Sequence, residues 1–164
     1  MDAREVIAAN PFFAEVLGDT EIDMLAGRAL KRDYGHGLEL VREDDSGSSL
    51  FIVVSGQVDV IAGGQGGKRI ARLGPGAVVG EMSLMTGARR SATVIAATDV
   101  TVLEVTKAAL APVFEASPEL IGRFAAVLRK RQGELDRAFG SGGLGIMGER
   151  GFGDLIRGFF GGGL

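Results

Sequence analysis

The chain has 164 residues, of which 46% are hydrophobic and 24% charged, a balance typical of one globular domain and not of a disordered chain. Its formal net charge of -3 disfavours general binding to nucleic acid, for which a positive surface is usual. The absence of cysteine excludes disulfides and thiolate chemistry, and the single histidine, His36, excludes a multi-histidine metal site.

Two further features bear on location. No apolar run approaches the roughly 18 residues that a membrane-spanning helix needs. The acidic N-terminus lacks the basic start and apolar core of a signal peptide. We therefore expect a cytoplasmic protein, either free or as the cytoplasmic part of a membrane-associated system, and we expect no resident cofactor or metal.

The first 30 residues indicate short helices. Asn10 and Pro11 place a capping side chain before a first-turn proline, and Thr20 with Asp23 resembles a capping box for the next helix. Gly27 is suited to end that helix, because glycine readily leaves the helical conformation.

From Lys31 to about Val105 the chain consists of short β-rich runs separated by turn residues. The runs cover residues 38–42, 50–55, 57–62, 69–73, 92–96 and 100–105. Asp45-Ser46-Gly47 and Gly74-Pro75-Gly76 are among the turns between them. Many short strands at near-regular spacing, with no long helix between them, predict a β-sandwich, barrel or jelly roll.

Helix is expected again after Val105. Thr106 caps a short helix that reaches Phe114, and the dipeptide at 117–118 opens a longer one. Four apolar residues share one face of the longer helix: Leu120, Phe124, Leu128 and Leu135. The predicted fold is therefore mainly β with flanking helices, in which the last long helix lies across a small β-roll.

The segment from Gly80 to Val94 carries the most chemistry. It begins with a glycine after an apolar strand, continues through a helix-like turn that ends at Gly87, and leads through two arginines into a new strand. Backbone N–H groups at the start of a helix form a cradle for an anion, and an arginine offers a planar fork to two phosphate oxygens. Glu81 is placed to accept a hydroxyl hydrogen bond. These groups together indicate a site for a phosphorylated sugar.

This segment resembles the phosphate-binding cassette of cyclic-nucleotide-binding domains. The resemblance covers roughly residues 10–137, including the early strands and the glycine turn of residues 41–58. The family includes regulatory subunits of cAMP-dependent kinase, catabolite activator proteins and nucleotide-gated channels. The resemblance implies a β jelly roll with N-terminal helices and a C-terminal lid helix, acting as a non-catalytic sensor.

The resemblance also implies a role for individual residues. Glu81 would hold the ribose 2′-hydroxyl and Arg90 would pair with the cyclic phosphate, whereas Arg89 would face solvent because neighbours on a strand point to opposite sides. The rest of the nucleotide-binding set would line the cradle: Gly80, Met82, Ser83, Ser91 and Ala92. Gly56 would serve a tight turn. Asp44 stands where the family usually has glycine, and Asp tolerates the left-handed turn expected there.

Ligand choice and signalling follow from the same resemblance. In the family a threonine directly after the phosphate arginine favours cGMP, and Ser91 stands here, so we expect cAMP to bind better than cGMP. The candidate lid contacts over the purine are Leu128, Arg131 and Leu135. We expect the lid helix to dock loosely without nucleotide and to close with it. The effector would be a protein or domain outside this chain, such as a membrane channel or transporter.

Other functions fit less well. A cupin-type metalloenzyme needs several histidine and glutamate ligands, which one histidine cannot supply. A transcription factor needs a helix-turn-helix after the long helix, and only the glycine-rich tail follows Gly140. The serious alternative is a degenerate roll that no longer binds nucleotide and acts only in assembly or interaction.

Glycine is concentrated at the C-terminus, where 11 of the 27 glycines lie in residues 140–164. This shift predicts a cyclic-nucleotide-binding domain over residues 1–139 and a glycine-rich tail over residues 140–164. Five apolar residues of the tail have the spacing of one helical face: Phe152, Leu155, Ile156, Phe159 and Phe160. Two alternatives stay open, a tail disordered in isolation and a tail docked on a groove, a partner or a membrane surface.

Overall fold

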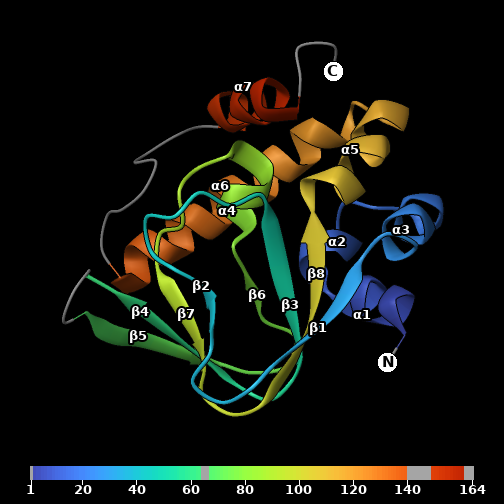
Figure 1. The fold of residues 1–164 in the computed structure, drawn as a ribbon. Coiled ribbons are helices and arrows are strands. Elements are labelled where there is room, and N and C mark those ends of the chain that lie inside the picture. The colour runs from blue at the N-terminus through green and yellow to red at the C-terminus, as the bar shows by residue number, and fades with distance from the viewer. Residues whose placement is uncertain (1, 64–66, 140–148, 161–164) are drawn as a thin grey trace.

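The computed structural model describes residues 2–63, 67–139 and 149–160. Its β part consists of two four-stranded antiparallel sheets (Figure 1). The first sheet has the strand order β1 (Leu30–Tyr34), β8 (Val100–Thr106), β3 (Ser49–Ser55), β6 (Val78–Val79). The second has the order β2 (Glu39–Val41), β7 (Thr93–Ala96), β4 (Val58–Ala62), β5 (Lys68–Leu73). This arrangement of two antiparallel sheets confirms the predicted β jelly roll.

Strand β3 lies inside its sheet and is buried on both faces, which explains why its sequence is apolar without alternation. Successive side chains of a strand point to opposite faces of the sheet. Leu50 and Ile52 pack into a core shared with the helices, whereas Phe51 and Val53 pack into a second core between the sheets. A strand buried on both faces therefore reads as a continuous apolar run.

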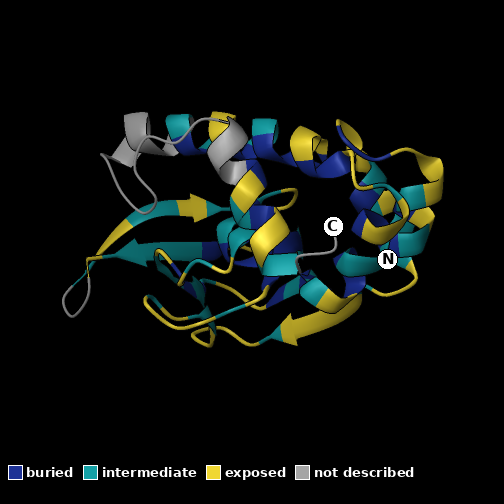
Figure 2. Cartoon of the chain, turned by 90° about the horizontal axis from the view of Figure 1, so that it is seen from above, coloured by how far each residue is buried: buried dark blue, intermediate teal, exposed yellow. Residues whose placement is uncertain are grey.

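The helices that cover the first sheet come from both ends of the chain. The N-terminal ones are α1 (Ala3–Ala9), α2 (Pro11–Ala14) and α3 (Asp19–Ala26); the C-terminal ones are α5 (Lys107–Ala116) and α6 (Leu120–Phe139). In the core between them the ring of Phe124 lies 6.1 Å from that of Phe13 and 5.7 Å from that of Phe114. In Figure 2 the buried residues of α6 lie on the side that faces the rest of the domain. The predicted apolar face of α6 is confirmed for Leu120, Phe124 and Leu128, and the side chain of Leu135 lies outside the described residues.

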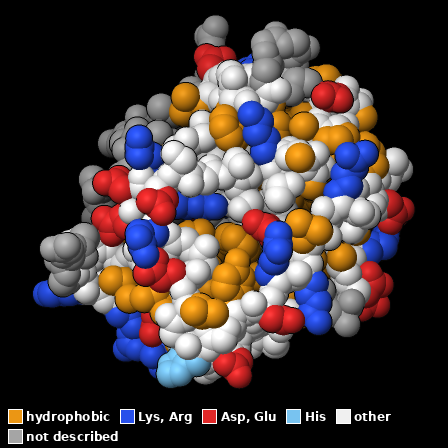
Figure 3. All heavy atoms as spheres, in the orientation of Figure 1, with side chains coloured by type: hydrophobic (Ala, Val, Ile, Leu, Met, Phe, Trp, Pro, Cys, Tyr) orange, Lys and Arg blue, Asp and Glu red, His pale blue; other side chains and the backbone are white. Residues whose placement is uncertain are grey.

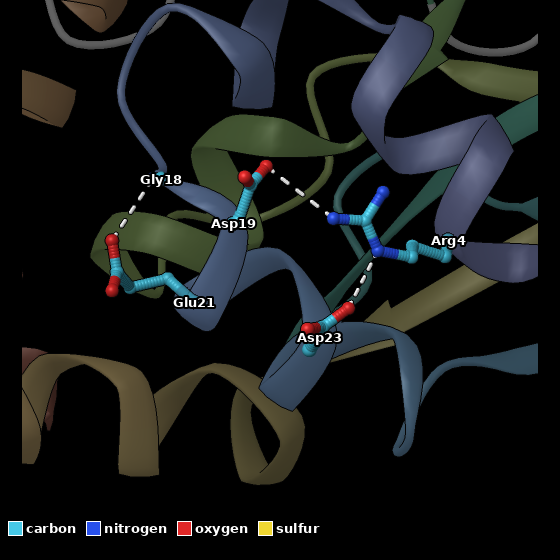
Figure 4. Close-up of polar contacts among 5 residues, drawn as sticks. All are labelled: Arg4, Gly18, Asp19, Glu21 and Asp23. Atoms are coloured by element: carbon cyan, nitrogen blue, oxygen red, sulfur yellow. Dashed lines mark hydrogen bonds and ion pairs between the residues drawn. The ribbon is translucent and has the colours of Figure 1, made fainter.

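The capping predictions have mixed outcomes. Asn10 caps α2 by accepting from the Phe12 amide at 3.1 Å, and Thr106 caps α5 by accepting from Ala109. The capping box expected from Thr20 and Asp23 is wrong. The Gly18 amide donates instead to the Glu21 carboxylate at 2.9 Å, as Figure 4 shows. Asp23 is engaged elsewhere, since Arg4 of α1 donates to it at 2.6 Å and ties α1 to α3.

The six predicted runs all contain strands, but β1 was not among them. Four of its five residues are exposed, so a charged edge strand gives no alternating pattern to read. Two turn predictions are confirmed by backbone geometry. Gly56 has φ +84°, and Asp44, with φ +72°, is the one non-glycine residue in the left-handed region within the described ranges.

Two further helices complete the fold, α4 (Glu81–Thr86) and α7 (Glu149–Phe160). Figure 1 shows α7 lying over α4 and α6, which it contacts. The predicted boundary after residue 139 coincides with the end of α6, and the division into a domain and a tail stays a prediction. No helix in the described ranges is long and apolar enough to span a membrane.

Candidate functional site

The short helix α4 is bounded by two glycines in the left-handed conformation. Gly80, with φ +86°, turns the chain from β6 directly into α4, and Gly87, with φ +76°, ends it. Residues other than glycine rarely adopt this backbone conformation, so glycine is strongly favoured at both positions. A Cβ on Gly80 would also collide with the guanidinium of Arg90. The predicted short helix between two glycines is therefore present, with Arg90 directly against its start.

Arg90 is a buried cation that is held by neutral oxygens. Only 7% of the residue is exposed. Its Nη1 donates to the Ser49 carbonyl at 2.7 Å and to the Gly80 carbonyl at 3.4 Å, and its Nη2 donates to the Ser49 hydroxyl at 3.4 Å. No described carboxylate lies within ion-pair distance of it.

The electrostatics of Arg90 favour an anionic ligand. Burial lowers the pKa of its guanidinium, and the more distant carboxylates of Glu104 and Glu81 act in the opposite direction. A buried charge without a partner of opposite sign is poorly compensated, because neutral dipoles replace only part of its lost hydration. An anion that reached this guanidinium would complete the compensation.

The loop before β3 positions Arg90 through backbone bonds. The Arg90 amide donates to the Asp45 carbonyl at 2.9 Å, and the Asp44 amide donates to the Arg90 carbonyl at 2.8 Å. Gly47 lies so close to the guanidinium that a Cβ there would collide with it. Arg89 is exposed, as predicted, and donates to the Asp44 carbonyl at 2.9 Å.

Glu81 links α4 to the long helix α6. Its side chain is 8% exposed and accepts a hydrogen bond from Nε of Arg131 at 2.9 Å. Arg131 also donates to the Val78 carbonyl at 3.3 Å, and its guanidinium carbon lies 5.7 Å from the centroid of the Phe12 ring. The carboxylate expected to bind ribose is thus also the contact point of α6.

The other predicted site residues lie around this centre. Met82 is half-buried and Ser83 fully buried in α4, whereas Ser91 is exposed and Ala92 half-buried in the bend before β7. Of the three candidate lid residues, Arg131 reaches α4, and Leu128 is fully buried in the helical core. The side chain of Leu135 lies outside the described residues.

An open hollow of about 570 Å³ lies beside Arg90. Its wall is formed by residues 37–42 together with Asp45 and Ser46. On the face drawn in Figure 3 basic and acidic side chains are interspersed. An anion in the hollow would therefore meet the side chain of Arg90.

Several residues of the site gave no recognisable sequence signal. Ser49 accepts hydrogen bonds from Arg90 and Gly47 leaves space for its guanidinium. The Val78 carbonyl and the Phe12 ring contact Arg131. The turn containing Gly47 was predicted, but its closeness to Arg90 depends on residues 43 positions apart in the chain. Backbone carbonyls such as that of Val78 are present at every position, so sequence alone cannot single one out.

Comparison with known proteins places this geometry in a class. The sequence profile of the family described as cyclic nucleotide-binding domain matches residues 31–117. The chain is 34% identical over 130 residues to a cyclic nucleotide-gated potassium channel of Mesorhizobium japonicum, covering 79% of this chain and 35% of the channel. It is 31% identical over 122 residues to the cyclic AMP receptor protein of Thermus thermophilus, covering 73% of this chain and 56% of that protein. The chain thus spans about a third to just over half of these relatives.

Solved structures agree with the sequence relatives. The N-terminal domain of a transcriptional regulator from Streptomyces coelicolor superposes with a TM-score of 0.67 at 28% identity, covering 81% of this chain and 94% of that one. The Thermus thermophilus catabolite activator protein superposes with a TM-score of 0.66 at 31% identity, covering 78% of this chain and 61% of that one. The protein is a jelly-roll domain with flanking helices. It belongs to the cyclic nucleotide-binding domain family.

Proposed function

We propose that this domain is a non-catalytic sensor that binds a cyclic nucleotide, with cAMP preferred over cGMP. The observation that carries the proposal is Arg90, a buried cation whose hydrogen-bond partners in the described ranges are neutral oxygens. A cyclic phosphate carries one negative charge and two free oxygens, which match the two-pronged guanidinium. The phosphate would thus provide the compensating charge that the protein does not place beside Arg90.

Glu81 supports the ribose contact and a route for the signal. An ionised carboxylate accepts about four hydrogen bonds through its two oxygens. Arg131 donates to Oε1 of Glu81, which leaves Oε2 for the ribose 2′-hydroxyl. The nucleotide would then be joined to α6 through Glu81 and Arg131, so its binding would hold α6 more firmly against α4.

This link defines the lid in our proposal. Arg131 is the residue of α6 that already reaches the cassette, and it lies between the carboxylate of Glu81 and the ring of Phe12. A nucleotide shifts the position of α6 only by the difference in its affinity for the two arrangements. We therefore propose that α6 transmits occupancy to an effector outside the described chain, such as a channel or transporter.

The preference for cAMP rests on Ser91. The residue is exposed in the bend before β7. A single hydroxyl contact to a guanine amino group contributes about 1 kcal/mol, which gives less than about tenfold discrimination. We therefore propose that cAMP binds better than cGMP, but by a modest factor.

Calorimetric titration of the full chain with cAMP, cGMP and 5′-AMP tests this function. We expect saturable binding of cAMP, weaker binding of cGMP within about tenfold, and much weaker binding of 5′-AMP. The linear nucleotide is the matched control, since it keeps the base and the ribose but not the cyclic phosphate. Absence of binding by both cyclic nucleotides would favour the alternative, a degenerate roll that serves only assembly or interaction.

A further inference from the structure

Helix α7 packs against α4, α5 and α6, and its apolar residues Ile156, Phe159 and Phe160 face the groove between these helices. Ile156 is fully buried in the helical core. The Phe160 ring meets that of Phe114 on α5 edge-to-face at 4.9 Å. The charged residues Asp154 and Arg157 are exposed and pair with each other at 3.3 Å. The helix is therefore amphipathic, and the residues that contact the domain are apolar.

The helical state of α7 depends on this docking. The helix has 12 residues and contains Gly151, Gly153 and Gly158. Each glycine weakens a helix by about 1 kcal/mol relative to alanine. A helix of fewer than about 12–15 residues is marginal alone in water even for good helix formers. Burial of its apolar side chains in the groove is thus what keeps α7 folded.

One ring of α7 contacts the far end of the cassette helix. The Phe159 ring lies against Gly87, the residue that ends α4, so closely that a Cβ on Gly87 would collide with it. Lys107 of α5 also contacts this ring, with Nζ 4.1 Å from its centroid. Phe159 therefore contacts the C-terminal end of α4, whereas Gly80 and Glu81 of the proposed nucleotide site lie at the opposite end.

We propose that the groove between α4, α5 and α6 is a second binding site of this domain, specific for an amphipathic helix. Helix α7 occupies it in cis, and its occupancy is linked to nucleotide binding through α4. The linkage rests on the function proposed above; the positioning of α4 by α7 does not. Because coupling between two sites is reciprocal, docked α7 strengthens nucleotide binding and bound nucleotide strengthens the docking of α7.

The test compares Phe159→Ala with Arg157→Ala in the full chain. Phe159→Ala removes the ring on Gly87, whereas Arg157→Ala changes the exposed side of the same helix and serves as the matched control. Amide hydrogen exchange should become at least about fivefold faster in residues 84–87 and in α7 for Phe159→Ala alone, since about fivefold is the lower end of typical couplings. Affinity for cAMP should fall by a similar factor in the same variant.

A second variant covers the case in which loss of one ring leaves α7 in place. Ile156→Asp puts a carboxylate into the apolar groove and should release α7 with the same effects on exchange and on affinity. Circular dichroism of each variant is the control that checks whether the β-roll stays folded.

The outcomes separate the two proposals. Unchanged exchange in residues 84–87 after release of α7 would overturn the positioning of α4. Unchanged cAMP affinity after that release would overturn the linkage between the sites. If the wild-type chain binds neither cyclic nucleotide, the proposed function fails together with the linkage. The exchange rates of α4 then still decide whether α7 positions that helix.

Discussion

At the scale of single residues, the partners of its charge distinguish the buried Arg90 from arginines of the surface. Several exposed arginines of this chain pair with carboxylates, as Arg72 does with Asp59 and Arg42 with Glu39. Arg90 instead donates to carbonyl and hydroxyl oxygens inside the domain. Burying a cation among neutral groups destabilises the fold, which supports the proposed role of Arg90 in binding an anion.

The surface pair between Asp59 of β4 and Arg72 of β5 gives a pH-dependent prediction. Arg72 donates to both carboxylate oxygens, at 2.8 and 3.1 Å, and thereby lowers the pKa of Asp59 below its usual 3.8. A carboxylate whose pKa is lowered in the folded state stabilises the fold at pH values above its unfolded-state pKa. This stabilisation is lost as the pH falls through the lower, folded-state pKa.

Asp59→Asn should therefore reduce the free energy of unfolding at pH 7 by about 0.2–1 kcal/mol, the range for exposed pairs. Urea titrations at several pH values should show this difference shrinking as the pH falls below the ordinary pKa of 3.8. Neutralising the exposed Glu115 of α5 is the control. A difference that grew toward low pH would show that the assigned sign is wrong.

At the scale of elements, the contact between α4 and α6 is the joint that would carry the proposed signal. Arg131 binds Glu81 in α4 and the carbonyl of Val78 in β6, so one side chain of α6 contacts both elements that lead into the site. The pair is partly buried, with 31% of the Arg131 side chain and 8% of the Glu81 side chain exposed. Coupling across such a pair is less screened by solvent than across a surface pair.

A double-mutant cycle on Glu81→Gln and Arg131→Gln measures this joint. We expect a coupling in the free energy of unfolding between about 0.5 and 3 kcal/mol, the range for residues in direct contact. The exposed pair of Glu39 and Arg42, with 38% and 65% of the side chains exposed, is the matched control. It should couple by less than about 1 kcal/mol. Equal coupling in both cycles would mean that burial adds nothing to the joint.

The same cycle in cAMP affinity separates two roles of Glu81. Glu81→Gln keeps a neutral amide oxygen as acceptor for the proposed ribose contact and should weaken binding by about 1 kcal/mol, because a hydrogen bond to a charged group becomes one to a neutral group. Arg131→Gln should weaken binding by less, because Arg131 acts through Glu81 and α6. A larger loss of cAMP affinity for Arg131→Gln than for Glu81→Gln would show that the dominant contact with the nucleotide comes from α6.

At the scale of the whole molecule, nucleotide binding should order segments that are distant in sequence. With α6 joined to α4 through Arg131, cAMP should slow amide exchange across residues 120–138 as well as across the cassette at 80–92. Hydrogen exchange measured by mass spectrometry with and without cAMP makes this comparison, and the edge strand β1 is the internal control. Protection confined to the cassette would exclude α6 as the transmitting element.

The separation in sequence between contacting residues explains which parts of the molecule could be predicted from sequence. Most strands were predictable from short apolar runs between turn residues, and the cassette was predictable because glycine, acid and arginine stand at short, fixed spacing around a local turn. The contacts of Arg131 with Glu81 and of Arg90 with Ser49 join residues 50 and 41 positions apart. They depend on how the helices pack, which no local pattern specifies. The docking of Phe159 on Gly87 is a contact of the same kind.

The central claim is that a cyclic phosphate pairs with Arg90, and titration of Arg90→Ala with cAMP tests it most directly. Arg90→Lys keeps the charge without the planar fork, and Arg123→Ala removes an exposed arginine of α6 as the matched control. We expect Arg90→Ala to lose about 2–5 kcal/mol of binding free energy, as for truncation of a buried charged partner. Arg90→Lys should lose less, and Arg123→Ala should bind as the wild type does. Wild-type affinity in a folded Arg90→Ala variant would contradict the assignment of the site.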